Sequence, residues 1–532
     1  MAVRIDQHSK AEPGGADVIE SLSIQHVPFA ERHGKLWKQG PFWFQGNFQP
    51  FTLSLGFIGP GLGLSVGWTV LASALGLLVG TFFMAFHASQ GPQLGLPQMI
   101  QSRGQFGYRG VIVPLAATLF TFVGFNVVDT IIIGHGLNAV FGWDVTTVGI
   151  GITILAVVLA VYGHDWLHRA FQVLFWCSAP CWLLLSIGIL SGWVTGPADA
   201  APIAGGFTLV AFMVQFTAAA GYNISYAPYV SDYSRYLPRD TPTSRIVASV
   251  FGGAAGSPMW LIPIGAWMAA TLGVNDPLAG TRDAGDQMVG GLGAVLTVLS
   301  VLALVATMGL NAYSGMLTVL TGIDSIRPLR PGRRARVLTI GGLAVVWCAV
   351  GLSVSADFST ALGNALLLML FLLIPWTAVN LVDYFFVRRG RYAITHLFRP
   401  DGVYGTWAWR GLLAYGVGLL LMAPFMVVGP FTGPVAQALG GVDVAFVIGL
   451  AVSGILYYAL TRGMDLSAEE PAVAASEREL AQGEPASADA APVPAQAADG
   501  AGEPTAPGGR TIASAGGPDG LPTVDGLPAV DG

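Results

Sequence analysis

Leu55–Leu64 reads LGFIGPGLGL and Gly221–Asp232 reads GYNISYAPYVSD, and both stretches place helix-breaking residues inside a long apolar segment. Backbone groups surrounded by hydrocarbon must be paired within the protein, so a broken helix is tolerated only beside a cavity or buried in protein. Two interrupted segments at matching positions of two five-helix halves are typical of inverted-repeat transporters with a site at the midplane. The alternative is that these small residues only permit close helix crossing.

The composition places the rest of the chain in a membrane as well. Hydrophobic residues make up 53% of the 532 residues and charged residues 11%, which is about half the charged share of a soluble domain. Apolar segments of membrane-spanning length recur about twelve times, near Phe48–Ser65, Thr69–Ala88, Val111–Ala139, Val148–Tyr162, Phe171–Val194, Phe207–Val230, Ile246–Leu272, Val289–Thr321, Val337–Val354, Phe358–Val387, Leu412–Val428 and Val442–Leu460. The sequence therefore predicts an all-α, polytopic membrane protein with about twelve transmembrane helices.

The basic residues predict the orientation of these helices. With twelve spans, all of the 25 Lys and Arg residues except Arg282 fall on one side of the membrane. Basic loops face the cytoplasm, so both termini are expected there, in a cell membrane. We interpret residues 1–40 as a cytoplasmic tail, 41–465 as the transmembrane domain and 466–532 as a disordered cytoplasmic tail. The arginine clusters are topology determinants or contacts to lipid head groups, and we expect no nucleic-acid binding.

One carboxylate lies well inside a predicted span. Phe125, Asn126 and Asp129 fall on one face of the third span at helical spacing. An ionisable group at this depth is costly, and by default it indicates function. Burial disfavours the charged carboxylate, so Asp129 could bind and release a proton. The alternative is a neutral, hydrogen-bonded aspartate that locks two helices together.

Other polar and aromatic residues lie near the broken sixth span and in the eighth. Tyr222 and Tyr226 are the nearest aromatic residues to the sixth-span break, with Asn223 and Ser225 beside them. The eighth span carries a polar stripe of Thr307, Asn311, Ser314 and Thr318 at helical spacing. Aromatic faces and carboxamides suit a flat, neutral heterocycle, because amides pair with the edges of nucleobases and aromatic rings stack on their faces. An amino acid held by the exposed amides of the broken helices remains an alternative.

Four stretches resemble one family of permeases. They are Pro97–Gly110 (PQMIQSRGQFGYRG), Gly124–Gly134 (GFNVVDTIIIG), Tyr226–Pro238 (YAPYVSDYSRYLP) and Leu310–Gly315 (LNAYSG). They are similar to segments of the purine–cytosine permeases, which belong to the nucleobase–cation symporters, and the similarity runs from about Phe42 to Arg462. The resemblance implies a LeuT-like fold of two inverted five-helix repeats plus two extra helices.

The resemblance also implies roles for particular residues. Asn311 matches an asparagine that contacts the base, with Thr307 one turn earlier, and Asn126 and Asp129 match the polar residues of the third helix. Phe125 lies near the position of a stacking tryptophan in some relatives. The opposite wall and the broken first helix are matched by Tyr222, Asn223, Ser225, Ser54 and Gly56. Relatives that use sodium have two adjacent hydroxyl residues just before the asparagine, where this chain has Val305 and Ala306. That difference, with Asp129, favours H+ over Na+ as the coupling ion.

Together these features predict a secondary active transporter that imports a nucleobase, cytosine or a purine, by proton symport through alternating access. The expected partners are the small-molecule substrate and the lipid bilayer, and no cofactor or metal is expected. Alternatives are a symporter of another solute on the same fold (an allantoin- or hydantoin-like heterocycle, a vitamin or an amino acid) and a membrane receptor without transport activity. An enzyme is disfavoured because the chain has no HExxH motif and no nucleophile elbow.

Overall fold

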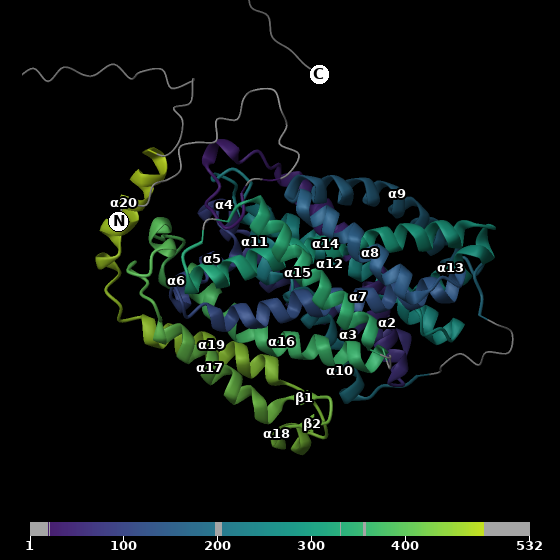
Figure 1. Ribbon diagram of the computed structural model, residues 1–532. Helices are drawn as coiled ribbons and strands as arrows, with labels where there is room; N and C mark the ends of the chain where they lie inside the picture. The colour runs from purple at the N-terminus through teal and green to yellow at the C-terminus, as the bar shows by residue number, and fades with distance from the viewer. Residues whose placement is uncertain (1–19, 21, 197–204, 330, 355–357, 483–532) are drawn as a thin grey trace, which may run out of the picture. The chain divides into compact units, whose positions relative to one another are not determined.

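The computed structural model describes residues 20, 22–196, 205–329, 331–354 and 358–482 (Figure 1). Among these residues, eight helical segments are long and apolar enough to cross a membrane. The helices that form them are α3 (Val66–Ala88), α7 (Ile112–Phe141), α8 (Val145–Tyr162), α9 (His164–Leu190), α12 (Thr243–Trp267), α14 (Leu292–Ile326), α15 (Arg333–Ser353) and α16 (Phe358–Val382). Helix also occupies the other four predicted segments, so the expected all-α, polytopic fold is confirmed.

The remaining elements are shorter. The α-helices among them are α1 (Gln39–Asn47), α2 (Pro50–Gly61), α4 (Gln90–Leu94), α5 (Gln98–Gln101), α6 (Arg103–Phe106), α10 (Leu209–Ile224), α11 (Ala227–Ser234), α13 (Pro277–Met288), α17 (Trp409–Met422), α18 (Pro434–Ala438), α19 (Ala445–Thr461) and α20 (Glu470–Gln482). Single 3-10 turns are η1 (Phe29–Glu31), η2 (Leu36–Lys38), η5 (Ile394–Phe398), η6 (Ala423–Phe425) and η7 (Leu466–Ala468), and η3 (Met268–Leu272) and η4 (Asp383–Val387) are π-helical. Strands β1 (Val427–Val428) and β2 (Phe431–Thr432) form an antiparallel pair.

Two spans are each built from two helices, as the sequence predicted. The first consists of α1 and α2 with a break at Phe48 and Gln49, and the sixth consists of α10 and α11 with a break at Ser225 and Tyr226. Pro50 opens α2, where its missing N–H leaves no hydrogen bond unmade. The side chain of Gln49 accepts a hydrogen bond from the backbone N–H of Phe51 at 2.6 Å and so caps the new helix. The two breaks therefore lie at corresponding positions, in spans one and six.

The predicted position of the first break is wrong. α2 continues without interruption through Gly56 and ends only at Gly61, so the glycine-rich stretch Leu55–Leu64 does not contain the break. A glycine in a tightly packed helix keeps its backbone hydrogen bonds, and Pro60 lies in the last turn of α2. The break lies instead where Pro50 starts a second helix after the amide-rich segment Gln45–Gln49.

Gly56 permits a close helix crossing. A Cβ atom at this position would lie 2.4 Å from the carbonyl oxygen of Ile262, and one at Gly265 would lie 2.0 Å from the carbonyl oxygen of Leu53. Backbone atoms cannot move aside as the end of a side chain can, so α2 and α12 approach as closely as they do only because both positions are glycine. Gly56 therefore lies in a helix crossing, the alternative that the sequence left open.

A Gly56→Ala substitution is expected to lower the yield of folded protein strongly, because the added methyl group forces α2 away from α12. The measurement is the recovery of monodisperse protein after extraction in mild detergent. Gly61→Ala is the matched control, since a Cβ atom at Gly61, in the same helix, meets nothing within 4 Å. Equal recovery of the two variants would contradict this account of Gly56.

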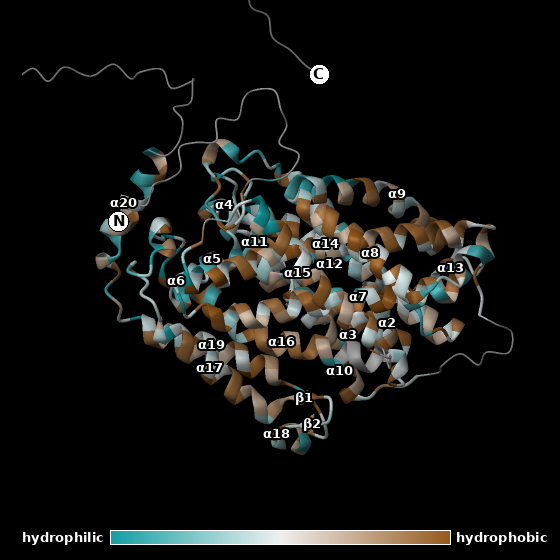
Figure 2. Cartoon of the chain, viewed as in Figure 1, coloured by the Kyte–Doolittle hydropathy of each residue, from teal (hydrophilic) through white to brown (hydrophobic). Residues whose placement is uncertain are grey.

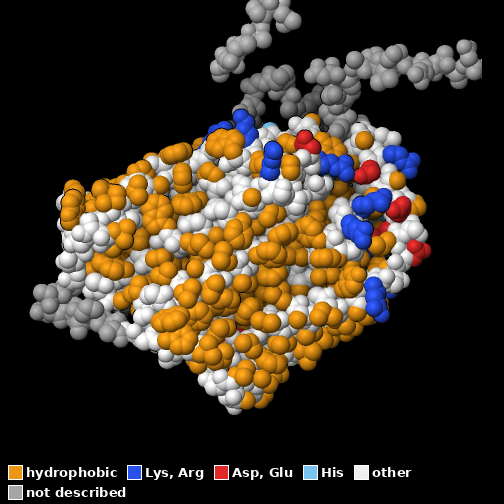
Figure 3. Space-filling model, turned by 180° about the vertical axis from the view of Figure 1, so that it is seen from behind, with side chains coloured by type: hydrophobic (Ala, Val, Ile, Leu, Met, Phe, Trp, Pro, Cys, Tyr) orange, Lys and Arg blue, Asp and Glu red, His pale blue; other side chains and the backbone are white. Residues whose placement is uncertain are grey.

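Polar and apolar residues are segregated along the described unit. Figure 2 shows hydrophilic residues concentrated around α4, α5, α6 and α20, whereas α8, α14 and α16 are largely hydrophobic. From behind, Lys and Arg side chains gather at one end and hydrophobic side chains cover most of the remaining face (Figure 3). We call the end that carries Arg103, Arg235, Arg336 and Arg388 the arginine end. Large apolar side chains exposed elsewhere, such as Trp176 and Leu338, suit contact with lipid.

The described part of the N-terminal segment packs against the arginine end, where the sequence predicted a tail. The carboxylate of Glu20 accepts hydrogen bonds from Arg336 at 2.8 Å, from Tyr313 at 2.9 Å and from Tyr236. Arg235 lies 3.7 Å from the same carboxylate. Burial by itself raises the pKa of Glu20, but the positive charges of Arg336 and Arg235 outweigh it, so its pKa lies below the ordinary value. Glu20 thus connects α11, α14 and α15 at this end.

A Glu20→Gln substitution is expected to destabilise the protein by about 3–5 kcal/mol at neutral pH, because it leaves two buried arginines without their carboxylate. Since the folded-state pKa is lowered, the contribution of Glu20 is fully present above its ordinary pKa of 4.5 and is lost as pH falls through the lowered value. The difference in melting temperature between wild type and variant should therefore shrink at acidic pH. Glu31→Gln, at an exposed position of the same segment, is the control. If the difference in melting temperature between wild type and Glu20→Gln does not change with pH, the charge of Glu20 is not its cause.

The predicted disorder from Leu466 onwards is wrong for the first seventeen residues. η7 and α20 are ordered, and α20 docks on the arginine end through its acidic side chains. The ion pairs are Glu469–Arg388 at 2.9 Å, Glu470–Arg391 at 2.8 Å, Glu477–Arg239 at 3.0 Å and Glu479–Arg399 at 3.3 Å. Composition alone suggested disorder because the partners of these glutamates lie in loops far away in the sequence. The rest of the predicted tail, 483–532, and residues 1–19 of the N-terminal tail lie outside the described residues.

Candidate functional site

A chain of hydrogen-bonded amides connects α7, α14 and α11 in the interior. The Asn311 amide donates to the side-chain oxygen of Asn126 at 3.0 Å, and the Asn126 amide donates to the backbone oxygen of Met308 at 3.2 Å. The hydroxyl of Tyr229 donates to the side-chain oxygen of Asn311 at 3.3 Å. Asn126 and Asn311, predicted from different spans, are therefore direct neighbours. Their carboxamides can offer both donors and acceptors to a heterocycle that takes the place of these mutual contacts.

Aromatic rings lie beside these amides. Phe51 of α2 stacks on Tyr222 of α10 with ring centroids 5.4 Å apart and an interplanar angle of 14°. Phe125 of α7 lies nearly parallel to Tyr226, with centroids 6.2 Å apart. Phe51 and Phe125 are themselves 5.2 Å apart, so the four rings form one cluster. Such faces can stack on a flat ligand.

The two broken helices are tied to each other at their breaks. Gln49 donates to the hydroxyl of Tyr222 at 3.1 Å, and the hydroxyls of Thr52 and Tyr222 lie 2.6 Å apart. The amide of Asn47 donates to the side-chain oxygen of Asn223 at 2.9 Å. These contacts join side chains of the two breaks. Backbone groups at the first break are paired by Thr52, whose hydroxyl donates to the backbone oxygen of Asn47 at 2.5 Å, and by Gln49, which accepts from the N–H of Phe51.

Three predicted site residues serve the backbone or neighbouring helices. The amide of Asn223 donates to Thr81 of α3 at 2.6 Å and to the backbone oxygen of Ala254 in α12 at 3.0 Å. Ser225 donates to the backbone oxygen of Tyr222, and Ser54 to that of Pro50, one turn away. Asn223 thus holds the sixth-span break in place, whereas Asn126 and Asn311 form the amide chain.

Asp129 lies one turn along α7 from Asn126 and Phe125. Its side chain is 1% exposed, and its Oδ2 atom has no hydrogen-bond partner among the described residues. An ionisable group this deep in a membrane protein is costly, which makes Asp129 a candidate for a functional role.

Thr307 connects α14 to the end of α1. Its hydroxyl donates to the backbone oxygens of Ala303 at 3.1 Å and of Gly46 at 3.3 Å. The residues before it, Val305 and Ala306, have no hydroxyl groups. Two helices are therefore joined here by a direct hydrogen bond.

The site is closed to solvent on all sides. The exposed fractions of its side chains are 4% for Phe125, 1% for Asn126, 0% for Tyr222, 1% for Tyr226, 3% for Thr307 and 1% for Asn311. On the side of the arginine end, Trp43 packs edge-on against Tyr226 with centroids 5.8 Å apart, and Phe42 stacks on His168 at 4.1 Å. These rings of α1 therefore cover the site on that side, against α9 and the break of the sixth span.

Several residues at the site were missed by sequence reasoning: Trp43, Asn47, Gln49, Phe51 and Thr52. All five belong to the first broken span, and they were missed because the break was placed too late. Tyr229 of the sixth span was missed as well, because a tyrosine near the end of a span also suits the membrane interface. A signal was present in Phe44–Phe51 (FQGNFQPF), where three amide side chains precede a proline inside an aromatic segment. Amides next to a proline within an apolar stretch indicate a break whose backbone groups need partners.

Known proteins share this sequence and fold. Residues 26–449 match the family described as permeases for cytosine/purines, uracil, thiamine and allantoin. A putative purine-cytosine permease of Bacillus subtilis is 35% identical over 84% of this chain and 96% of its own length. A purine-cytosine permease of Emericella nidulans is 24% identical over 83% of this chain and 88% of its own.

Among solved structures, Mhp1, a nucleobase-cation-symport-1 family transporter with bromovinylhydantoin bound, superposes with a TM-score of 0.63 at 18% identity, over 89% of this chain and 98% of its own. The likeness shows that the chain has the LeuT-like fold that the sequence predicted. The family match covers most of the chain, including every residue of the amide chain and the aromatic cluster. This protein therefore belongs to the family of permeases for cytosine/purines, uracil, thiamine and allantoin, and it is a membrane transporter.

Proposed function

We propose that this protein imports a nucleobase, cytosine or a purine, together with a proton. The observation that carries the proposal is the Tyr229–Asn311–Asn126 amide chain beside the stacked rings of Phe125 and Tyr226. Carboxamides match the donor and acceptor edge of a base, and aromatic rings bind its face. When a base binds, Asn126 and Asn311 would form hydrogen bonds with the base in place of the one between them. Their polar groups would therefore stay paired in the occupied site.

Transport would follow from the broken helices. The base and the proton enter from outside and bind between spans one, three, six and eight. The aromatic layer of Trp43 and Phe42 then separates as α1 and α11 move, and the site opens toward the arginine end, which is the cytoplasmic side in this proposal. The fixed site at the breaks is exposed first to one side and then to the other.

Asp129 is the proposed proton carrier. It is buried one turn along α7 from Asn126, and its Oδ2 atom has no partner among the described residues, so a change in its protonation would alter the charge next to the amide chain. Sodium coupling is less favoured because Val305 and Ala306 supply no hydroxyl oxygens and Thr307 donates directly to Gly46. Each charge that moves inward gains about 2.3 kcal/mol per 100 mV, which supports roughly fifty-fold accumulation of a neutral base.

Uptake measurements test this function. Cells that express the chain are expected to accumulate radiolabelled cytosine, adenine or hypoxanthine in sodium-free buffer, and a protonophore should abolish the accumulation. Uptake that requires sodium would overturn the proton assignment and leave the substrate assignment intact. Absence of base uptake by correctly inserted protein would overturn the substrate.

A second substrate class follows from the family itself, whose description includes thiamine and allantoin. The amide chain and the stacked rings suit allantoin and the pyrimidine ring of thiamine by the same chemistry. An amino acid is the remaining alternative on this fold. Competition of labelled cytosine by unlabelled cytosine, allantoin, thiamine and leucine separates these classes, because only ligands of the same site will compete.

A further inference from the structure

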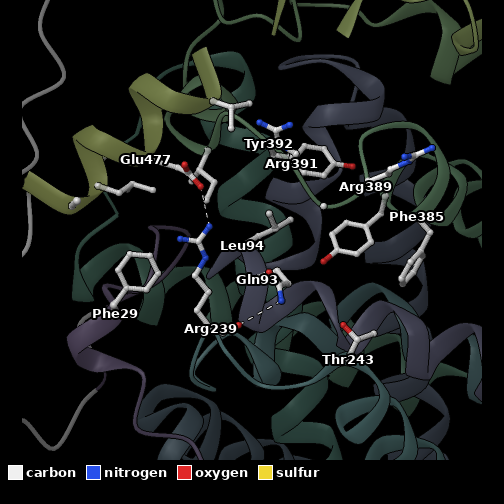
Figure 4. A pocket seen from close by; sticks show the side chains of 16 residues that line it. Phe29, Gln93, Leu94, Arg239, Thr243, Phe385, Arg389, Arg391, Tyr392 and Glu477 are labelled. Atoms are coloured by element: carbon white, nitrogen blue, oxygen red, sulfur yellow. Dashed lines mark hydrogen bonds and ion pairs between the residues drawn. The ribbon is translucent and has the colours of Figure 1, made fainter. Parts of the chain in front are cut away.

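A cavity of about 720 Å³ lies at the arginine end, apart from the candidate site (Figure 4). Its wall combines the N-terminal segment, the loop before α12, η4 with the loop that follows it, and the docked helix α20. The residues used below are Phe29, Arg239, Phe385, Arg389, Arg391 and Glu477. The volume is within the range of small-molecule sites, and neither the amide chain nor the aromatic cluster contributes to the lining.

The lining is positively charged. Three arginines face a single glutamate, since Arg239, Arg389 and Arg391 line the cavity together with Glu477. Arg239 pairs with Glu477 at 3.0 Å, and Arg391 pairs with Glu470 at 2.8 Å. Arg389 has no ion-pair or hydrogen-bond partner among the described residues. Figure 4 shows Arg389 next to Phe385 on one side and the Arg239–Glu477 pair on the other.

Two further observations support an anion site. Arg389 has a φ of 51° and is the one non-glycine residue with a positive φ in the described part of the chain, a conformation that is usually kept for a functional reason. Burial and the positive charges of Arg32 and Arg239 also lower the pKa of His26, beside the cavity, to about 3. The backbone conformation fixes the position of Arg389 after η4, and the arginines around His26 show positive charge at this cavity, where a negative charge is favoured.

An aromatic path leads from the cavity to the apolar flank of the molecule. Phe385 lies edge-on to Phe86 with centroids 5.5 Å apart, and Phe86 contacts Phe82 at 4.6 Å. Phe82 is 48% exposed and Phe386 is 65% exposed, so the path ends on the surface that faces lipid. Phe385–Arg391 (FFVRRGR) thus places apolar rings directly before arginines, which suits the border between acyl chains and head groups.

We propose that this cavity binds a phosphate-bearing anion supplied by the membrane, the head group of an anionic phospholipid. Arg239, Arg389 and Arg391 contact the phosphate, and Phe385 and Phe86 contact the start of an acyl chain. Glu477 of α20 competes for Arg239, so lipid binding and the docking of α20 are coupled. A soluble phosphate compound shares the head-group chemistry but makes no use of the aromatic path. The site is independent of the transported substrate, and its test does not depend on uptake.

The test uses full-length protein in a neutral detergent and titrates phosphatidylglycerol, phosphatidylcholine or inorganic phosphate while the melting temperature is measured. We expect phosphatidylglycerol to raise the melting temperature more than the other two. Arg389→Gln should weaken its apparent affinity about fivefold. Because Arg389 has no partner among the residues that the structure describes, this variant should fold as wild type does. Arg169→Gln is the matched control, an exposed arginine at the start of α9 with no ion pair.

A second variant predicts a change of opposite sign. Glu477→Gln removes the competing carboxylate from Arg239 and should tighten phosphatidylglycerol binding by a similar factor. If Arg389→Gln and Arg169→Gln bind the lipid equally well, the site is refuted. If inorganic phosphate stabilises the protein as strongly as phosphatidylglycerol does, and only Arg389→Gln abolishes this, the anion site stands and its lipid source is refuted.

Discussion

Replacing Asn311 with leucine is expected to abolish nucleobase uptake and to weaken binding on the order of a hundredfold. Leucine has the same branched arrangement of side-chain heavy atoms but no polar atoms, so the substitution removes one donor and one acceptor from the centre of the amide chain. The side-chain oxygen of Asn126 and the hydroxyl of Tyr229 then lose their partners. Each buried group left unsatisfied costs about 1–3 kcal/mol, and the ligand loses its direct contact as well.

The measurement is equilibrium binding of labelled cytosine to purified protein, together with uptake in cells. Ser300→Ala is the matched control, because Ser300 is a buried polar residue of the same helix whose hydroxyl has no partner. Its binding should equal that of wild type. Undiminished cytosine binding by Asn311→Leu would place the substrate elsewhere and remove the main support for the proposed function.

Replacing Asp129 with asparagine is expected to preserve binding but to eliminate concentrative uptake. Asparagine has the shape of a protonated aspartate and cannot release a proton, so the coupled step is lost while the site stays intact. Accumulation should fall from roughly fifty-fold at 100 mV to equality between the two sides. Exchange of labelled for unlabelled base across the membrane should continue, because exchange needs no net proton movement.

The experiment compares accumulation and exchange in proteoliposomes with an imposed potential and pH gradient. Asp144→Asn is the control, because Asp144 is an exposed cap at the start of α8 and lies outside the site. Normal accumulation by Asp129→Asn would show that Asp129 locks helices together and carries no proton. Loss of both binding and exchange would show that it contacts the base directly.

The sequence predicted correctly those features that depend only on residues close to one another in the chain. The apolar segments, the distribution of Arg and Lys, and the break around Ser225 and Tyr226 all follow from neighbouring residues, and the structure has helices and a break there. The sequence predicted that Asn126 and Asn311 belong to the same site, but it did not predict that their side chains contact each other. The 3.0 Å contact between them depends on how α7 and α14 cross.

Two predictions from the sequence, the position of the first helix break and the disorder of the acidic C-terminal segment, were wrong for the same physical reason. The first break was expected in the glycine-rich stretch around Gly56, but the helix is unbroken there and the missing side chain allows the backbone of α12 to approach. Glu469, Glu470, Glu477 and Glu479 were assigned to a disordered tail because acidic segments are solvated when alone, yet each faces an arginine from a distant loop. In both cases the partner lies more than 70 residues away in the sequence.

By itself, the sequence determined that this chain is an all-α membrane protein and the family to which it is related. These properties depend on the hydrophobicity and charge summed over each segment of the sequence. Such a sum does not change with the residues that the segment contacts in the folded protein. Only the tertiary structure decided which asparagine faces the site and which holds a break, because a carboxamide takes its role from the donor or acceptor that packing brings within about 3 Å. Asn223 and Asn311 have the same chemistry, and only the neighbours that the fold gives them separate their roles.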